Sequence, residues 1–180
     1  IMRASIPRRI YIECRVPEEP LLVQGDAVQI RQVAMNLITN AAEAIEGSGN
    51  IAVSVSESDE DGLEPRGPLP DTEHGYVLLK VEDDGCGMES EHVERIFDPF
   101  FSTKFSGSGL GLSAVLGIMR SHEGTILVET EKDLGTCFTA VFPRLPGESG
   151  ESGGEDEAAC GDPGMPGRVL VVDDERMVRE

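Results

Sequence analysis

The sequence predicts an α/β two-layer sandwich, in which a mixed β-sheet carries helices on one face. Two observations lead to this fold class. Several short segments alternate apolar and polar residues, as half-buried strands do. Between them lie two predicted helices, and the apolar residues of the longer one, residues 30–45, recur every three or four positions, as in an amphipathic helix. Because each kind of segment has one apolar side, a layer of helices and a layer of strands can bury each other.

The N-terminal part predicts one strand and the longest helix. Residues 10–16 (Ile-Tyr-Ile-Glu-Cys-Arg-Val) are rich in β-forming residues, and Pro17 ends the strand. Asp26 has the character of a helix N-cap, with Gln29 completing a capping box. The spacing that follows predicts an amphipathic helix ending near Gly47. Its apolar positions are Ile30, Val33, Ala34, Leu37, Ile38, Ala41, Ala42 and Ile45.

Three amide side chains lie four residues apart on this helix, beside its apolar stripe. They are Gln32, Asn36 and Asn40. Asn40 falls at the edge of the stripe, where its side chain would be half buried and would need hydrogen-bond partners. Taken alone, the spacing is more typical of a solvated helix face. The glycine-rich segments further along the chain favour a functional interpretation instead.

The middle of the chain predicts two strands separated by a loop. Residues 51–56 alternate strictly, and residues 76–82 predict a strand that delivers Asp83 at its end. Residues 57–75 are acidic and rich in Gly and Pro, so we interpret them as a surface loop without chemistry.

A short helix is expected over residues 90–96, followed by Phe97-Asp98-Pro99-Phe100-Phe101. The three phenylalanines fit either the core or a mobile lid over a ligand, because glycines at 107 and 109 would make the far end of a lid flexible. Residues 110–121 then predict a helix whose glycine-rich N-terminus suits an anion. Gly124 is expected to cap that helix, and residues 125–130 and 136–142 to form a hairpin.

The last residues change in composition. Residues 1–145 are expected to form one domain, and residues 146–167 an acidic linker rich in Gly, Pro and Ser that cannot build a core. Residues 168–180 begin with a Val-rich strand that ends in the paired carboxylates Asp173 and Asp174. So short a segment cannot bury enough surface to fold alone.

Composition excludes several classes of function. The 180 residues are 39% hydrophobic, which suffices for a core, and carry a formal net charge of −19. Such a charge argues against nucleic-acid binding and against docking on anionic membranes. The four cysteines have no Cys-x-x-Cys spacing, so a reducing cytoplasm is the expected location. The sequence has no apolar run of the ~20 residues that span a bilayer, although a membrane anchor elsewhere in a longer parent protein stays open.

Two glycine clusters predict a nucleotide site. Asp83 precedes Gly85 and Gly87, and Lys104 precedes Gly107, Gly109 and Gly111. Glycines let backbone N–H groups approach anions closely, so we expect Asp83 to meet a base and the second cluster to meet phosphates. A P-loop is excluded because Gly-x-x-x-x-Gly-Lys-Ser/Thr is absent, and the glycine spacing matches a dinucleotide fingerprint poorly.

Four segments, in order, extend this pattern. They are Gln32-x-x-x-Asn36-x-x-x-Asn40, Asp83-x-Gly85-x-Gly87, residues 96–104 (Ile-Phe-Asp-Pro-Phe-Phe-Ser-Thr-Lys) and Gly107-x-Gly109-Leu110-Gly111. They resemble the N box, first G box, F box and second G box of the ATP-binding catalytic domain of two-component sensor histidine kinases. This family lies in the GHKL group, with gyrase, Hsp90 and MutL. The resemblance covers roughly residues 9–144.

The resemblance implies a role for each matching residue. Asp83 would accept a hydrogen bond from the adenine amino group, supported by Thr136 through its hydroxyl or a water. Asn40 would ligate the Mg²⁺ that bridges the phosphates, since an amide oxygen suits a hard cation. Asn36 and Lys104 are the expected catalytic residues. The ATP-binding residues would be Asn36, Asn40, Asp83, Gly85, Gly87, Lys104, Gly107, Gly109, Leu110, Gly111 and Thr136.

Asn36 also bears on the reaction. ATP-hydrolysing relatives have a Glu at this position, whereas an amide is no base, so the γ-phosphoryl group would be kept for another acceptor. Transfer would then depend on positioning and charge neutralisation. The alternatives are an ATP-hydrolysing or anti-sigma-type relative, and a degenerate module that only binds a nucleotide or a partner. The presence of Asn40, Asp83 and Gly109 argues against the degenerate module.

The resemblance places the partners outside this chain. The phosphoaccepting histidine would lie on a dimerisation domain before Ile1, and the parent protein would be a homodimer. The three histidines present, His74, His92 and His122, each have a more ordinary explanation, so the chain should bind ATP without phosphorylating itself. Residues 168–180 resemble the start of a receiver domain, with Asp173 and Asp174 as its Mg²⁺ pair, which would make the parent a hybrid kinase.

Overall fold

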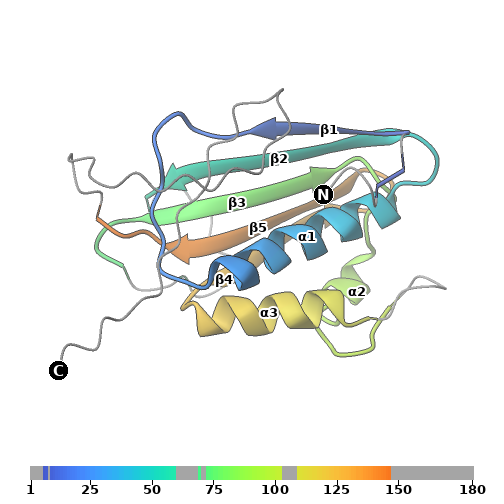
Figure 1. The fold of residues 1–180 in the computed structure, drawn as a ribbon. Coiled ribbons are helices and arrows are strands. Elements are labelled where there is room, and N and C mark those ends of the chain that lie inside the picture. Colours follow the sequence, from blue (N-terminus) through green and yellow to red (C-terminus); the bar gives the residue numbers. More distant parts are fainter. Residues whose placement is uncertain (1–5, 8, 60–68, 70–71, 103–108, 147–180) are drawn as a thin grey trace.

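Two layers form the fold (Figure 1), a mixed sheet and a pair of helices on one of its faces, as the sequence predicts. The computed structural model describes residues 6–7, 9–59, 69, 72–102 and 109–146. Within these residues, five strands pair in the order β1-β2-β3-β5-β4; β1 and β2 are parallel and the other neighbours antiparallel. The elements are β1 (Ile10–Arg15), α1 (Ala27–Ala44), β2 (Gly49–Ser58), β3 (Tyr76–Asp83), α2 (Ser90–Val93), α3 (Gly111–Ser121), β4 (Thr125–Glu131) and β5 (Gly135–Pro143).

Helix α1 begins where its N-cap predicts. Asp26 Oδ1 accepts the N–H groups of Val28 and Gln29 at 2.7 and 3.2 Å, which satisfies two of the unpaired donors in the first turn. The predicted capping box is wrong in its second half. The N–H of Asp26 does not turn to Gln29 but donates to Nε2 of His122, at 3.0 Å.

His122 therefore joins the start of α1 to the end of α3. Its Nδ1 lies 2.8 Å from the carbonyl oxygen of Ile118, to which only a protonated Nδ1 can donate, while Nε2 accepts from Asp26. Both ring nitrogens are therefore used by hydrogen bonds within the fold. Gly25 makes room for the ring, because a Cβ there would lie 2.2 Å from His122 Cδ2.

The end of α3 is closed by Glu123 rather than by the predicted Gly124. Glu123 takes a positive φ of 55°, and its N–H donates to Arg120 O at 3.3 Å. The N–H of Gly124 donates to Met119 O at 2.8 Å, which completes a Schellman motif. Gly124 is required for space instead, since a Cβ there would lie 2.6 Å from the carbonyl oxygen of Val141.

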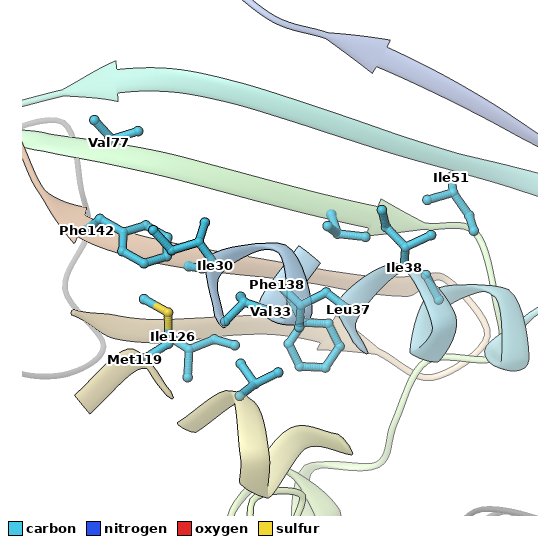
Figure 2. Close-up of a cluster of buried hydrophobic side chains, with 14 of the residues drawn as sticks. Ile30, Val33, Leu37, Ile38, Ile51, Val77, Met119, Ile126, Phe138 and Phe142 are labelled. Atoms are coloured by element: carbon cyan, nitrogen blue, oxygen red, sulfur yellow. The ribbon is translucent and has the colours of Figure 1, made fainter. Parts of the chain in front are cut away.

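The main core lies between the helices and the sheet (Figure 2). Helix α1 buries the predicted stripe, with Val33 and Leu37 fully enclosed. Strand β3 alternates, so Val77 and Val81 face the helices and Asp83, two residues on, faces the same side. The labelled core side chains are Ile30, Val33, Leu37, Ile38, Ile51, Val77, Met119, Ile126, Phe138 and Phe142.

A second, smaller cluster lies on the other face of the sheet. Tyr76, Leu78 and Val141 are buried there, and Leu69 packs against them. Residues 57–75, predicted as a surface loop, thus contribute at least Leu69 to packing. The first two of them, residues 57–58, belong to β2 instead. Among the described residues, no helix combines the length and the hydropathy that crossing a bilayer requires.

Candidate functional site

A row of three polar side chains crosses one end of the sheet on its helix-bearing face. Asp83, Thr136 and Thr130 are register partners on β3, β5 and β4. Asp83 and Thr136 are each only 5% exposed. Oδ1 of Asp83 accepts the N–H of Gly85 at 2.9 Å. Carboxylate and hydroxyl oxygens accept hydrogen bonds, so this end of the sheet is suited to a ligand that donates them.

The first G box fits tightly between α1 and the β4–β5 hairpin. A Cβ at Gly85 would lie 2.7 Å from Ala44 O and 2.7 Å from Asp83 Oδ1. The N–H of Cys86 donates to Ala44 O at 3.0 Å, which fastens the loop to the last turn of α1. Gly87 has a φ of +59°, and a Cβ there would lie 1.9 Å from Glu131 O. Both glycines are therefore required by the path of this loop.

Asp84 fastens the same loop to β2. Its Oδ1 accepts the backbone N–H of Asn50 at 2.8 Å, and its Oδ2 accepts from Asn50 Nδ2 at 2.7 Å. These hydrogen bonds hold the pKa of Asp84 below its ordinary value. The charge of Asp84 therefore supports the fold, a role that the sequence did not indicate.

The asparagine-bearing face of α1 meets the start of α3 at Asn36. Asn36 and Asn40 are half-buried, and Asn36 Nδ2 donates to the carbonyl oxygen of Gly111 at 3.3 Å. Gly111 is the first residue of α3, and its N-cap, Leu110, makes no capping bond through its side chain. The first N–H groups of α3 thus lie beside the asparagine face, which suits an anionic group.

The F box packs on the second G box. The N–H of Phe100 donates to Gly109 O at 2.9 Å, and a Cβ at Gly109 would lie 2.5 Å from Phe100 C. Phe97 and Phe101 pack against the core, whereas Phe100 is 77% exposed. The guanidinium group of Arg95 lies 4.5 Å from the centre of the Phe101 ring. Of the two interpretations of the phenylalanines, core packing applies to two of the three.

The structure brings several of the predicted site residues close to α1 or to one another. Asn36 contacts Gly111, Gly85 packs on the last turn of α1 at Ala44, and Asp83 and Thr136 are register partners. Lys104, Gly107, Asp173 and Asp174 fall outside the described residues. Thr130 was missed, because its place in the row follows from the register of the hairpin, which its own sequence neighbourhood does not reveal.

A groove elsewhere on the molecule does not belong to this site. It measures about 530 Å³ and lies at the opposite end of the sheet, where β1 and β2 end. Its lining consists of residues 15–21, residues 55–57 and Arg144. It contains none of the glycine-rich segments and neither Asp83 nor the asparagines. This groove is therefore not a candidate for the predicted nucleotide site.

Comparison with known sequences identifies relatives. Residues 25–146 match the protein family described as histidine kinase-, DNA gyrase B-, and HSP90-like ATPase. The sensor kinase CckA of Brucella abortus (strain 2308) is 40% identical over 128 residues, which cover 68% of this chain and 13% of that protein. Sporulation kinase E of Bacillus subtilis (strain 168) is 35% identical over 115 residues, or 64% of this chain and 14% of that protein. The chain thus spans about an eighth to a seventh of these curated relatives.

Solved structures share the fold. The mycobacterial sensor histidine kinase MprB superposes with a TM-score of 0.61 at 27% identity, covering 77% of this chain and 86% of that one. Full-length ShkA in complex with AMPPNP gives a TM-score of 0.63 at 25% identity, covering 82% of this chain and 29% of that one.

Proposed function

The chain belongs to the histidine kinase-, DNA gyrase B- and HSP90-like ATPase family, as an ATP-binding catalytic domain of the sensor histidine kinase type, and we propose that it holds ATP along the C-terminal half of α1. Asp83 would receive the adenine, and Asn36, Asn40 and the first turn of α3 would receive the phosphates. Two observations carry the proposal: a buried carboxylate at Asp83, and a start of α3 that lies beside Asn36 and whose N-cap, Leu110, makes no side-chain capping bond.

Magnesium fits the phosphate end of this site. The amide oxygen of Asn40 is a ligand that Mg²⁺ accepts, and the Nδ2 of the same side chain is buried. The described residues contain no group of three His, Cys, Asp or Glu that could hold a metal alone. Mg²⁺ would therefore take its remaining ligands from the phosphates and water, as it commonly does. Lys104 and Gly107 would complete the phosphate contacts, and Gly85, Gly87, Gly109 and Leu110 would shape the two loops.

The proposed reaction is donation of the γ-phosphoryl group to a histidine. Asn36 holds Gly111 through its amide and has no basic group with which to activate water, so hydrolysis would not be promoted. Transfer would depend on positioning and on charge neutralisation by Asn40-bound Mg²⁺ and Lys104. The acceptor would be the dimerisation domain of the same protein, in a homodimer.

The proposed setting is a phosphorelay in the cytoplasm, where ATP is available and cysteines stay reduced; Cys14, Cys86 and Cys137 are free thiols. Residues 1–145 would be the catalytic domain, residues 146–167 a linker, and residues 168–180 the start of a receiver domain with Asp173 and Asp174 as its Mg²⁺ pair. The parent protein would then be a hybrid kinase that transfers the phosphoryl group onward.

The chain with labelled Mg-ATP should bind the nucleotide without labelling itself. Both ring nitrogens of His122 are hydrogen-bonded within the fold. Neither His74 nor His92 belongs to the row formed by Asp83, Thr136 and Thr130. Calorimetric titration measures the binding, and acid-labile labelling measures the transfer. Binding without labelling supports the proposal. Strong labelling of a histidine in this chain would contradict it, and rapid release of labelled phosphate would favour an ATP-hydrolysing relative.

A further inference from the structure

Thr130 lies at the centre of the hydrogen bonds behind the base end of the site. Its Oγ1 is 3.0 Å from the carbonyl oxygen of Gly135, 3.0 Å from Thr136 Oγ1 and 3.0 Å from the backbone nitrogen of Met88. These three contacts come from β5 and from the loop after the first G box. They are enough to use the full hydrogen-bonding capacity of one hydroxyl group.

The direction of each bond follows from counting protons. Gly135 O can only accept, so the single proton of Thr130 points to it. The N–H of Met88 can only donate, which occupies one lone pair of Thr130 Oγ1. If Thr130 instead donated to Thr136, its oxygen would face Gly135 O with no proton between them. The Thr136 hydroxyl must therefore donate to Thr130.

We propose that Thr130 is a positioning residue that makes the site selective for a 6-amino purine over a 6-oxo purine. Because the proton of Thr136 is held by Thr130, the oxygen of Thr136 is left to accept. Thr136 is the register partner of Asp83, whose carboxylate also accepts. The base end of the site then presents two acceptors, which suit the amino group of adenine, directly or through a water. The inference rests on the proposed ATP-binding function.

A 6-oxo purine nucleotide such as inosine triphosphate brings an acceptor to the same place. It is rejected because Thr136 cannot turn its proton toward the ligand while Thr130 holds it. Sites that pair buried polar groups discriminate strongly between such analogues, since a mismatched ligand leaves those groups unpaired. Without the Thr130 hydroxyl, Thr136 is free to rotate and donate to the 6-oxo group.

Thr130→Val should therefore narrow the preference of the chain for Mg-ATP over Mg-ITP. The dissociation constant for Mg-ITP divided by that for Mg-ATP is expected to fall roughly five- to thirtyfold, the effect of one buried hydrogen bond. Thr130→Ser keeps the hydroxyl and should keep the ratio within about twofold of the original. Thr139→Val is the matched control, because Thr139 is a buried threonine that faces the opposite side of the sheet, and it should leave the ratio unchanged.

Titration of each variant with both nucleotides measures the ratio, and thermal melting verifies that each variant is folded. Thr130→Ala, which carries the same expectation as Thr130→Val, serves if the valine variant does not fold. An unchanged ratio in a folded Thr130 variant that lacks the hydroxyl would overturn the inference while leaving ATP binding intact. Failure of the unaltered chain to bind Mg-ATP would instead overturn the proposed function.

Discussion

Asp83→Asn is expected to lower the affinity for Mg-ATP by at least about 100-fold, or close to 3 kcal/mol, while the fold stays intact. Asp83 can accept hydrogen bonds at both carboxylate oxygens, and one of them already accepts the N–H of Gly85. An asparagine accepts at a single oxygen, so its NH₂ group would face either Gly85 or the adenine amino group, donor against donor. Calorimetric titration with Mg-ATP measures the loss.

Glu82→Gln is the matched control for this substitution. Glu82 precedes Asp83 on β3, is exposed and points to the opposite face of the sheet, so the variant removes the same charge one position away. We expect its affinity for Mg-ATP to stay within about twofold of the original, because surface charges far from a ligand contribute little. Equal losses in the two variants would mean that net charge, rather than the base contact, accounts for the effect.

Gly135→Ala is expected to lower the free energy of unfolding by about 3 kcal/mol or more. Gly135 has a φ of +110°, and a Cβ there would lie 1.9 Å from the carbonyl oxygen of Asp83. Neither backbone can move without pulling Asp83 and Thr136 apart. The affinity for Mg-ATP should therefore fall together with the stability, which chemical denaturation and titration measure separately.

Alanine substitutions at two other glycines distinguish the cost of a positive φ from the cost of a steric overlap. Gly47 has a φ of +93° but open space around its Cβ position, so Gly47→Ala should cost only the strain, about 1–2 kcal/mol. Gly117 lies within α3 with ordinary helical geometry and open space, so Gly117→Ala should raise the free energy of unfolding by about 0.5–1 kcal/mol. Equal stabilities of the Gly135 and Gly117 variants would contradict the close approach of β5 to Asp83.

Periodicity predicted the fold because most elements here have one clear apolar side. The stripe of α1, the alternation of β2 and the strand predicted over residues 76–82 identified elements that the structure confirms to within two or three residues at each end. The caps were predicted less well, since they depend on tertiary contacts. The N–H of Asp26, which the sequence assigned to Gln29, donates instead to His122, 96 positions further along the chain. Glu123 adopts the left-handed conformation that was expected of Gly124.

The site was predictable where a residue type is itself the signal. Asp83 after a strand and glycines at fixed spacing stand out in one dimension, and the structure places Gly85 against the last turn of α1 and Gly111 beside Asn36. Thr130 and Asn50 carry no such signal. A threonine within a strand and an asparagine near a turn are ordinary residues, and their roles depend on strand register and on a neighbour 34 positions away.

Backbone NMR of the isotope-labelled chain during titration with Mg-AMPPNP tests most directly whether these segments form one ATP site. The largest shifts are expected at Gly85, Gly87, Gly111 and Thr136, which come from three segments far apart in the sequence. Lys80 on the opposite face and Arg144 in the distant groove should stay unchanged. Shifts concentrated at the distant groove, with the glycines and Thr136 unaffected, would contradict the assignment of the site.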